Sequence, residues 1–236
     1  MPTNSVRPSP DPDISPIAAL IADPGRMAML FAVLDGRTLS ASELARRAGI
    51  SATAASGHLA KLIAGGLLVV RPVGRQRLYR MATGDVGRAV EALAVVAQPP
   101  KIIALSQSKV VGQMHLARSC YDHLAGKLGV GITESLVARH VIVPVRRSDY
   151  RVTAKGSAYL LTLGIDVEPL LRKKRYFARQ CIDWTERRPH LAGALGAAVR
   201  DRFFANGWIE RTRASRAIRI TSEGRAAIEQ FLGLTL

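Results

Sequence analysis

The second half of the chain contains an internal repeat. Residues 123–143, HLAGKLGVGITESLVARHVIV, align with residues 190–210, HLAGALGAAVRDRFFANGWIE, at an offset of 67 positions. The motifs VTAKG and ITSEG, which hold Thr153 and Thr221, follow at an offset of 68. A constant offset over two separate segments indicates a duplicated structural unit. Each copy is predicted to hold two helices, a short hairpin and a further helix that a threonine caps.

The repeat divides the chain. Residues 116–236 are predicted to form two winged-helix-like units that serve effector binding or dimerisation. Residues 98–115, which include a Pro-Pro pair, are predicted to be a linker with a helix. Residues 14–97 form a separate predicted domain, and residues 1–13 read as a disordered polar arm. The predicted fold class is mainly α with small β-hairpin wings.

Within residues 14–97, two short helices stand on either side of a tight turn. Ser40 or Ser42 is placed to cap the first helix, and Gly49 closes it. Ser51 is placed to cap the second helix. The following residues, LLVVRPVGRQRLYRMA, change to an extended pattern with a basic tip. The order of helix, helix and basic hairpin predicts a winged helix-turn-helix.

This arrangement predicts contacts to double-stranded DNA. The second helix would lie in the major groove, and the hairpin would place arginines against phosphates or the minor groove. A histidine in the second helix fits a groove position or packing between helices better than a metal site. The candidate DNA-binding residues are Ser51, Thr53, Ala54, Ser56, Gly57, His58, Lys61, Arg71, Arg75, Gln76 and Arg77.

The motifs DPGRMAMLFAVLDG, SASELARRAGISATAASGHLAKLIAGGLL and VGRQRLYRMA resemble the ArsR/SmtB family of bacterial repressors. The resemblance implies operator binding as a homodimer, with a ligand or metal changing the affinity for DNA. Residues 84–97 resemble the helix through which family members pair. The cysteine motif of thiolate-sensing members is absent from the first helix of the pair. Residues 84–97 also lack the Asp/His ligands of zinc-sensing members, so any sensor is expected elsewhere.

The chain has two cysteines, and each stands two residues before an aspartate. Cys120 and His123 are predicted to share one face of a helix. If the two copies pack about a pseudo-twofold axis, two cysteines and two histidines could converge as ligands for zinc or another soft divalent metal. The alternatives are packing residues retained from the duplication, and a reversible thiol switch. The candidate effector or metal residues are Cys120, Asp122, His123, Cys181, Asp183 and His190.

The charge of the chain also suits a polyanion partner. The formal net charge is +16; residues 1–97 hold 11 Lys and Arg against 7 Asp and Glu, and residues 98–236 hold 23 against 11. A coding bias towards arginine is the alternative explanation. Two cysteines do not make a disulfide framework, and the longest apolar runs are shorter than a membrane span. We therefore expect a cytoplasmic protein without a membrane partner.

These observations predict a homodimeric, sequence-specific transcriptional regulator that acts as a repressor. An effector bound in or near the C-terminal region is expected to relieve the repression. The effector would be a small molecule, a metal or a redox signal. A sequence-tolerant DNA-compacting protein is the alternative. An enzyme that uses Cys120 and His123 is disfavoured, because no glycine-rich oxyanion or phosphate loop accompanies them.

Overall fold

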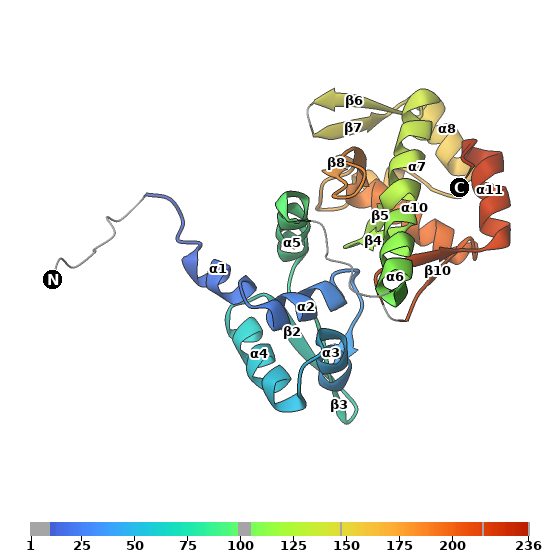
Figure 1. Cartoon of the computed structure of the whole chain (residues 1–236). Helices are drawn as coiled ribbons and strands as arrows, with labels where there is room; N and C mark the ends of the chain where they lie inside the picture. Colours follow the sequence, from blue (N-terminus) through green and yellow to red (C-terminus); the bar gives the residue numbers. More distant parts are fainter. Residues whose placement is uncertain (1–9, 99–104, 147, 214, 236) are drawn as a thin grey trace. The chain divides into compact units, whose positions relative to one another are not determined.

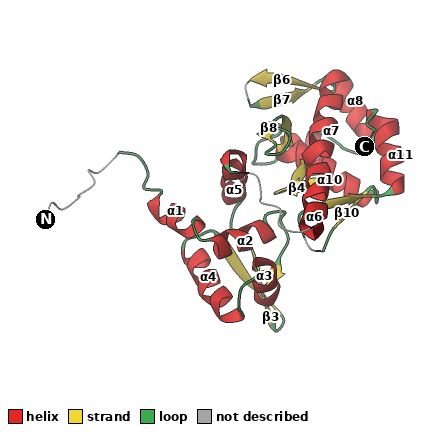
Figure 2. Cartoon of the chain, in the orientation of Figure 1, coloured by secondary structure: helices red, strands yellow, loops and turns green. Residues whose placement is uncertain are grey.

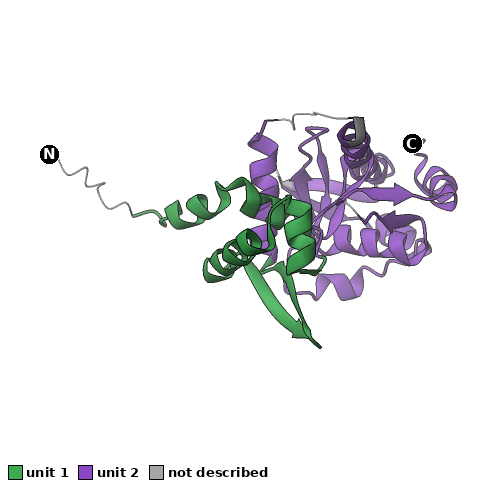
Figure 3. Cartoon of the chain, turned by 60° about the horizontal axis from the view of Figure 1, so that its bottom comes forward, with its two compact units in different colours: residues 1–33, 37–83 green, residues 34–36, 84–236 purple. Residues whose placement is uncertain are grey.

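The computed structural model divides into two compact units, which Figure 3 colours separately. The first unit comprises residues 1–33 and 37–83, and the second comprises residues 34–36 and 84–236. The structure describes residues 10–98, 105–146, 148–213 and 215–235. Residues 1–9 of the predicted arm at residues 1–13 and the predicted boundary at Pro99 therefore lie outside the described residues. The structural division falls at residue 83, whereas the sequence placed residues 84–97 with the first domain.

The first unit is a winged helix-turn-helix, as predicted (Figures 1 and 2). Its three strands form an antiparallel sheet in the order β1-β3-β2. The elements are α1 (Ser15–Ile21), α2 (Pro24–Val33), β1 (Leu39–Ser40), α3 (Ala41–Ala48), α4 (Ala52–Ala64), β2 (Leu68–Val73) and β3 (Gln76–Met81).

Local capping explains the helix boundaries of this unit. Ser40, the first of the two predicted candidates, caps α3 in a capping box with Glu43. Gly49 ends α3 with φ at +67°, a left-handed conformation that glycine adopts without strain. Ser51 caps α4 by accepting a hydrogen bond from the amide of Ala54. Asp23 accepts one from the amide of Arg26 at 2.8 Å and so opens α2.

The turn between α3 and α4 leaves one face of α4 buried. Ala55, Leu59 and Leu62 all point into the core, as their helical spacing predicted. The remaining face of α4 is largely exposed. The hairpin β2–β3 turns at Gly74 and Arg75, which lie at the exposed tip.

The second unit contains the duplicated region and α5, the helix that follows the wing. Its four-stranded sheet has the order β6-β7-β8-β9, and β4–β5 and β10–β11 form separate hairpins. The elements are α5 (Gly84–Val96), α6 (Leu105–Leu116), β4 (Arg118–Cys120), β5 (His123–Ala125), α7 (Gly126–Ala138), β6 (Ile142–Arg146), β7 (Asp149–Val152), α8 (Ala154–Thr162), α9 (Glu168–Leu171), β8 (Arg179–Ile182), β9 (Pro189–Ala192), α10 (Gly193–Ala205), β10 (Ile209–Arg211), β11 (Ile218–Ile220) and α11 (Ser222–Leu232).

Both copies of the repeat have the same order of elements: a hairpin, a long helix, a second hairpin and a final helix. The final helix begins in the predicted way in each copy. Thr153 accepts a hydrogen bond from the amide of Gly156 at 2.8 Å, and Thr221 accepts one from Gly224 at 2.9 Å. The second helix, the hairpin and the threonine-capped final helix predicted for each copy are therefore present, whereas a hairpin takes the place of the first predicted helix.

One prediction about the repeat is wrong. Cys120 and His123 do not share a helix face; they are paired across the tight hairpin β4–β5. Tyr121 adopts φ of +53° at the turn, which a helix does not allow. Gly126 adopts φ of +76°, and a Cβ at this position would lie 2.6 Å from the carbonyl oxygen of His115. The glycine of the HLAG motif thus marks the change from strand to helix.

The two copies share one hydrophobic core. The helix of each copy packs against the hairpin of the other. A Cβ atom added to Gly129 in α7 would lie 3.6 Å from the Cβ atom of His190. A Cβ atom added to Gly196 in α10 would lie 3.2 Å from the Cβ atom of His123. Thr133 in α7 also accepts a hydrogen bond from the amide of Leu191 at 2.8 Å. This reciprocal packing places the two hairpins side by side.

Within the described residues, no single helix has both the length and the apolar character needed to cross a membrane. One bent pair, α1 with α2, meets those criteria when its two helices are counted together.

Candidate metal centre and nucleic-acid interface

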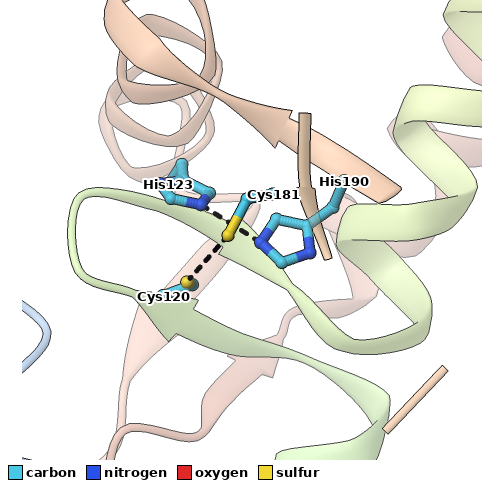
Figure 4. A group of neighbouring side chains, drawn as sticks. All are labelled: Cys120, His123, Cys181 and His190. Atoms are coloured by element: carbon cyan, nitrogen blue, oxygen red, sulfur yellow. Dashed lines mark hydrogen bonds between the residues drawn. The ribbon is translucent and has the colours of Figure 1, made fainter. Parts of the chain in front are cut away.

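Four predicted site residues meet between the two hairpins of the repeat (Figure 4). One ligand atom from each of Cys120, His123, Cys181 and His190 lies within 4.8 Å of all the others. The two sulfur atoms are 3.8 Å apart, and the two Nε2 atoms are 3.1 Å apart. Three of these side chains are buried, and Cys181 is half-buried. The cluster is therefore almost closed to solvent.

Equivalent positions in the two hairpins supply these side chains. Cys120 stands opposite His123 in the register of β4–β5, and Cys181 stands opposite His190 in that of β8–β9. The six residues WTERRP, 184–189, lengthen only the second hairpin. Residues 184–188 lie in the connecting loop and Pro189 begins β9, so Cys181 still stands opposite His190 in that hairpin.

The sulfur–sulfur distance and the nitrogen–nitrogen distance are close to those of a tetrahedral metal site. With Zn–S bonds of about 2.3 Å and Zn–N bonds of about 2.0–2.1 Å, a tetrahedron has an S–S edge of about 3.8 Å and an N–N edge of about 3.3 Å. The observed distances are 3.8 Å and 3.1 Å. A set of two thiolates and two imidazoles suits zinc and other soft divalent ions.

The two predicted aspartates orient the histidines. His123 Nδ1 lies 3.2 Å from Asp122 Oδ1, and His190 Nδ1 lies 3.3 Å from Asp183 Oδ2. A carboxylate on Nδ1 fixes the tautomer in which Nε2 is available to a metal. Asp122 and Asp183 thus lie behind the four ligand atoms. Each aspartate contacts the Nδ1 atom of a histidine, so it supports a possible ligand and is not placed as a ligand itself.

Asp183 is also held by groups from the other copy of the repeat. Its carboxylate accepts a hydrogen bond from Arg118 Nη2 at 2.9 Å and from the amide of Gly126 at 2.7 Å. Arg118 is fully buried, and it is not among the effector or metal residues predicted from the sequence. One available signal was its position two residues before Cys120, which Arg179 repeats before Cys181.

These contacts set the protonation preferences of the cluster. The hydrogen bond between the two thiols lowers the pKa of Cys181 and raises that of Cys120. Burial opposes the charging of His123, but the hydrogen bond to Asp122 and the Cys181 sulfur raise its pKa to about 9. Burial likewise opposes the ionisation of Asp122, whose pKa the bonds from His123 and Arg175 lower to about 2. A metal ion would displace protons here, since its ligands are thiolates and neutral imidazoles.

The predicted DNA-binding residues lie on α4 and the wing. All are exposed except His58, which is half-buried. The exposed residues are Ser51, Thr53, Ala54, Ser56, Gly57 and Lys61 on or next to α4, and Arg71, Arg75, Gln76 and Arg77 on the hairpin. The wing therefore presents all three predicted arginines to solvent.

Two α4 positions have informative surroundings. His58 Nε2 lies 3.8 Å from Asp23 Oδ1, so its ring packs against the start of α2, which is one of the two roles predicted for it. Gly57 is exposed in the middle of α4, and a Cβ there would meet nothing within 4 Å. Glycine destabilises a helix interior by about 1 kcal/mol relative to alanine. Nothing within the described chain requires a glycine at this position.

Comparisons with known proteins found a family model and a relative that matches nearly the whole chain. Residues 23–77 match a model of the MarR family. The chain is 41% identical over 226 residues to the uncharacterized HTH-type transcriptional regulator YdfF of Bacillus subtilis (strain 168), covering 96% of this chain and 100% of the relative.

Two solved structures resemble part of the chain. One is the homodimeric winged helix-turn-helix DNA-binding domain of a possible ArsR-family regulator from Mycobacterium bovis, 26% identical, covering 38% of this chain and 89% of that one, with a TM-score of 0.33. The other is reduced HlyU from Vibrio cholerae N16961, 27% identical, covering 36% of this chain and 88% of that one, with a TM-score of 0.33.

Proposed function

This chain belongs to the HTH-type transcriptional regulators, and from that premise we propose that it is a homodimeric repressor whose C-terminal region holds a metal ion and receives an effector. Its winged helix-turn-helix binds DNA. The narrower proposal is that this domain is of the ArsR type. It rests on the Asp-Pro-x-Arg, Ser-x-His-Leu and Gly-Arg-x-x-x-Tyr motifs within a region that also matches the MarR family.

The proposal of sequence-specific DNA binding rests on the exposed face of α4. Ala55, Leu59 and Leu62 fix the buried face, so the opposite face presents short hydroxyl side chains and a glycine that can approach base edges closely. Binding to the promoter of its own gene and to a scrambled duplex of the same length tests the proposal. Equal affinity for both duplexes would support the alternative of a sequence-tolerant DNA-compacting protein.

Exposed apolar side chains support the homodimer. Ile14 is 71% exposed and lies just before α1, whereas Val96 is 78% exposed at the end of α5. Leu93 of α5 is also exposed. Exposed apolar side chains on the segments that flank a DNA-binding core commonly mark a protein interface. The mass of the native protein by light scattering tests this assignment.

The proposal of a bound metal rests on the convergence of four possible ligands at a spacing close to tetrahedral: Cys120, His123, Cys181 and His190. All four coordination positions come from side chains, so the site would be closed, as in structural zinc centres. Metal analysis of the purified protein should give about one zinc per chain. Cys181→Ser should remove it, whereas metal-free native protein would contradict the proposal.

A thiol switch is the second candidate for the same residues, because the Cys120 and Cys181 sulfur atoms lie 3.8 Å apart. Two thiols and one peroxide molecule would give one disulfide and two water molecules. A bound metal would compete with this reaction by holding both sulfurs as thiolates. The two candidates are separated by metal content and by the number of reactive thiols in the native protein.

We also propose that the protein is cytoplasmic, because a repressor acts on DNA in that compartment.

A further inference from the structure

The six-residue insertion makes the two halves of the second unit unequal. Residues 115–122 correspond to residues 176–183 at an offset of 61, and the offset becomes 67 after the insertion 184–189. His115 therefore corresponds to Tyr176, and Arg118 to Arg179. The same comparison pairs Asp122 with Asp183 and Gly126 with Gly193.

In one half, the insertion fills the space beside the metal cluster. The Trp184 ring lies 4.4 Å from the Arg118 guanidinium and meets the edge of His115 at 5.8 Å between ring centroids. Thr185 Oγ1 accepts a hydrogen bond from Arg118 at 3.2 Å and donates one to Asp183 at 2.6 Å. An aromatic ring and a polar group thus occupy this space.

In the other half, no insertion separates Asp122 from His123, and a cavity of about 530 Å³ takes the corresponding place. Arg179, Tyr176, Asp122 and Gly193, the counterparts of the residues around Trp184, all line it. This volume lies within the range of about 300–1,000 Å³ that small-molecule sites occupy. The cavity is therefore the open equivalent of a space that the chain itself fills elsewhere.

The cavity has an excess of positive charge. Its lining carries Arg88, Lys174, Arg175 and Arg179 against the carboxylates of Asp85 and Asp122. Both carboxylates already have cationic partners: Asp85 pairs with Arg88, and Asp122 pairs with Arg175 at 2.6 Å. An incoming anion would therefore meet a net basic surface.

The cavity also has flat aromatic and guanidinium groups. The Arg179 guanidinium lies 4.8 Å from the Tyr176 ring, and Tyr121 contributes a second phenol to the lining. A planar ring in the cavity would meet Arg179 and Tyr176 as Trp184 meets Arg118 and His115. Aromatic character and negative charge together define the ligand.

We propose that this cavity binds a small aromatic carboxylate, with the carboxylate at Arg179 and Lys174 and the ring beside Tyr176. The ligand would be the effector of the repressor, and only this regulatory part rests on the proposed function. Asp85 and Arg88 in the lining belong to α5, which follows the wing after two residues, so a ligand there contacts the helix that continues from the DNA-binding domain.

Calorimetric titration of the full chain with indole-3-acetate and 1-naphthoate tests the site. Saturable binding is expected for these two probes, and at least tenfold weaker binding for acetate and for uncharged indole. Arg179→Ala and Lys174→Ala should each weaken probe binding severalfold. Arg151→Ala, which removes an exposed arginine outside the cavity, is the matched control and should bind as the native chain does.

Circular dichroism and metal content of each variant establish that it is folded before titration. Absence of binding by both aromatic probes at millimolar concentration would overturn the proposal, as would equal binding by Arg179→Ala, Lys174→Ala and Arg151→Ala. The titration contains no DNA, so its result stands whether or not the protein prefers its own promoter. Saturating probe should then weaken promoter binding by the native chain; unchanged affinity would overturn the effector role.

Discussion

Arg118 and Asp183 come from different copies of the repeat and form an ion pair at 2.9 Å in which both side chains are fully buried. The pair connects β4 to the loop that follows β8. It also fixes the position of the Asp183 carboxylate, which lies 3.3 Å from His190 Nδ1. Arg118 also donates a hydrogen bond to the carbonyl oxygen of Met114 at 3.1 Å. The pair therefore joins the architecture of the repeat to the geometry of the Cys/His cluster.

Arg118→Met should strongly destabilise the chain. The substitution leaves the buried Asp183 carboxylate without its cationic partner, and breaking a buried pair in this way costs about 3–5 kcal/mol. Chemical denaturation of the full chain measures the free energy of unfolding. The matched control is Arg219→Ala, whose exposed pair with Glu210 should contribute less than about 1 kcal/mol. Similar losses for both variants would contradict this account.

Asp122→Ala should weaken metal binding without abolishing it. The carboxylate orients His123 and is not among the four proposed ligand atoms. Loss of such a supporting residue typically lowers metal affinity about 10–100-fold. Competition with a chromophoric chelator measures the zinc affinity. Asp201→Ala removes an exposed carboxylate and serves as the control; an equal effect of the two substitutions would argue against an orienting role.

Arg75→Ala and Arg77→Ala together should weaken binding to every DNA sequence and reduce its dependence on salt. Each phosphate contact that is lost lowers the slope of log affinity against log salt by about 0.9. The two wing arginines should thus account for a change of nearly two in that slope. Fluorescence anisotropy at several salt concentrations measures it. An unchanged slope would show that the wing does not contact the DNA backbone.

Much of the first unit follows from the sequence because its signals are local. Ser40, Gly49 and Ser51 set helix boundaries through their own hydrogen bonds or backbone conformation, and neighbouring residues suffice to predict them. The buried positions of α4 follow from helical spacing alone. These features require no knowledge of distant parts of the chain.

The repeat made the cluster predictable, but not the elements that carry it. A duplicated Cys/His pair predicted convergence through approximate symmetry, and the four side chains do meet. The strands β4 and β5 contain only three residues each, which is too short for alternation to outweigh a helical spacing of Cys120 and His123. Arg118 was missed because its burial depends on contacts with distant residues, above all the ion pair with Asp183, 65 residues away.

The cavity beside the cluster illustrates a different limit. It exists because the first hairpin lacks the six residues that fill the equivalent space in the second. The alignment identified the insertion as an asymmetry, but volume depends on how the surrounding elements pack. Tyr176 and Arg179 belong to one copy, whereas Tyr121 belongs to the other, and α5 adds Asp85 and Arg88. No local pattern in the sequence assembles that lining.

Gly57→Ala should stabilise the fold and weaken DNA binding. Alanine is favoured over glycine in a helix interior by roughly 0.5–1 kcal/mol, and the added methyl group would meet nothing within 4 Å in the chain. On the groove-facing side of α4, the same methyl group would hold the helix backbone away from the bases. Thermal unfolding measures the gain in stability, and titration with the promoter duplex measures the loss of affinity. A more stable variant with undiminished affinity would remove Gly57 from the interface, because steric exclusion by DNA is the only role that its open surroundings leave for a glycine there.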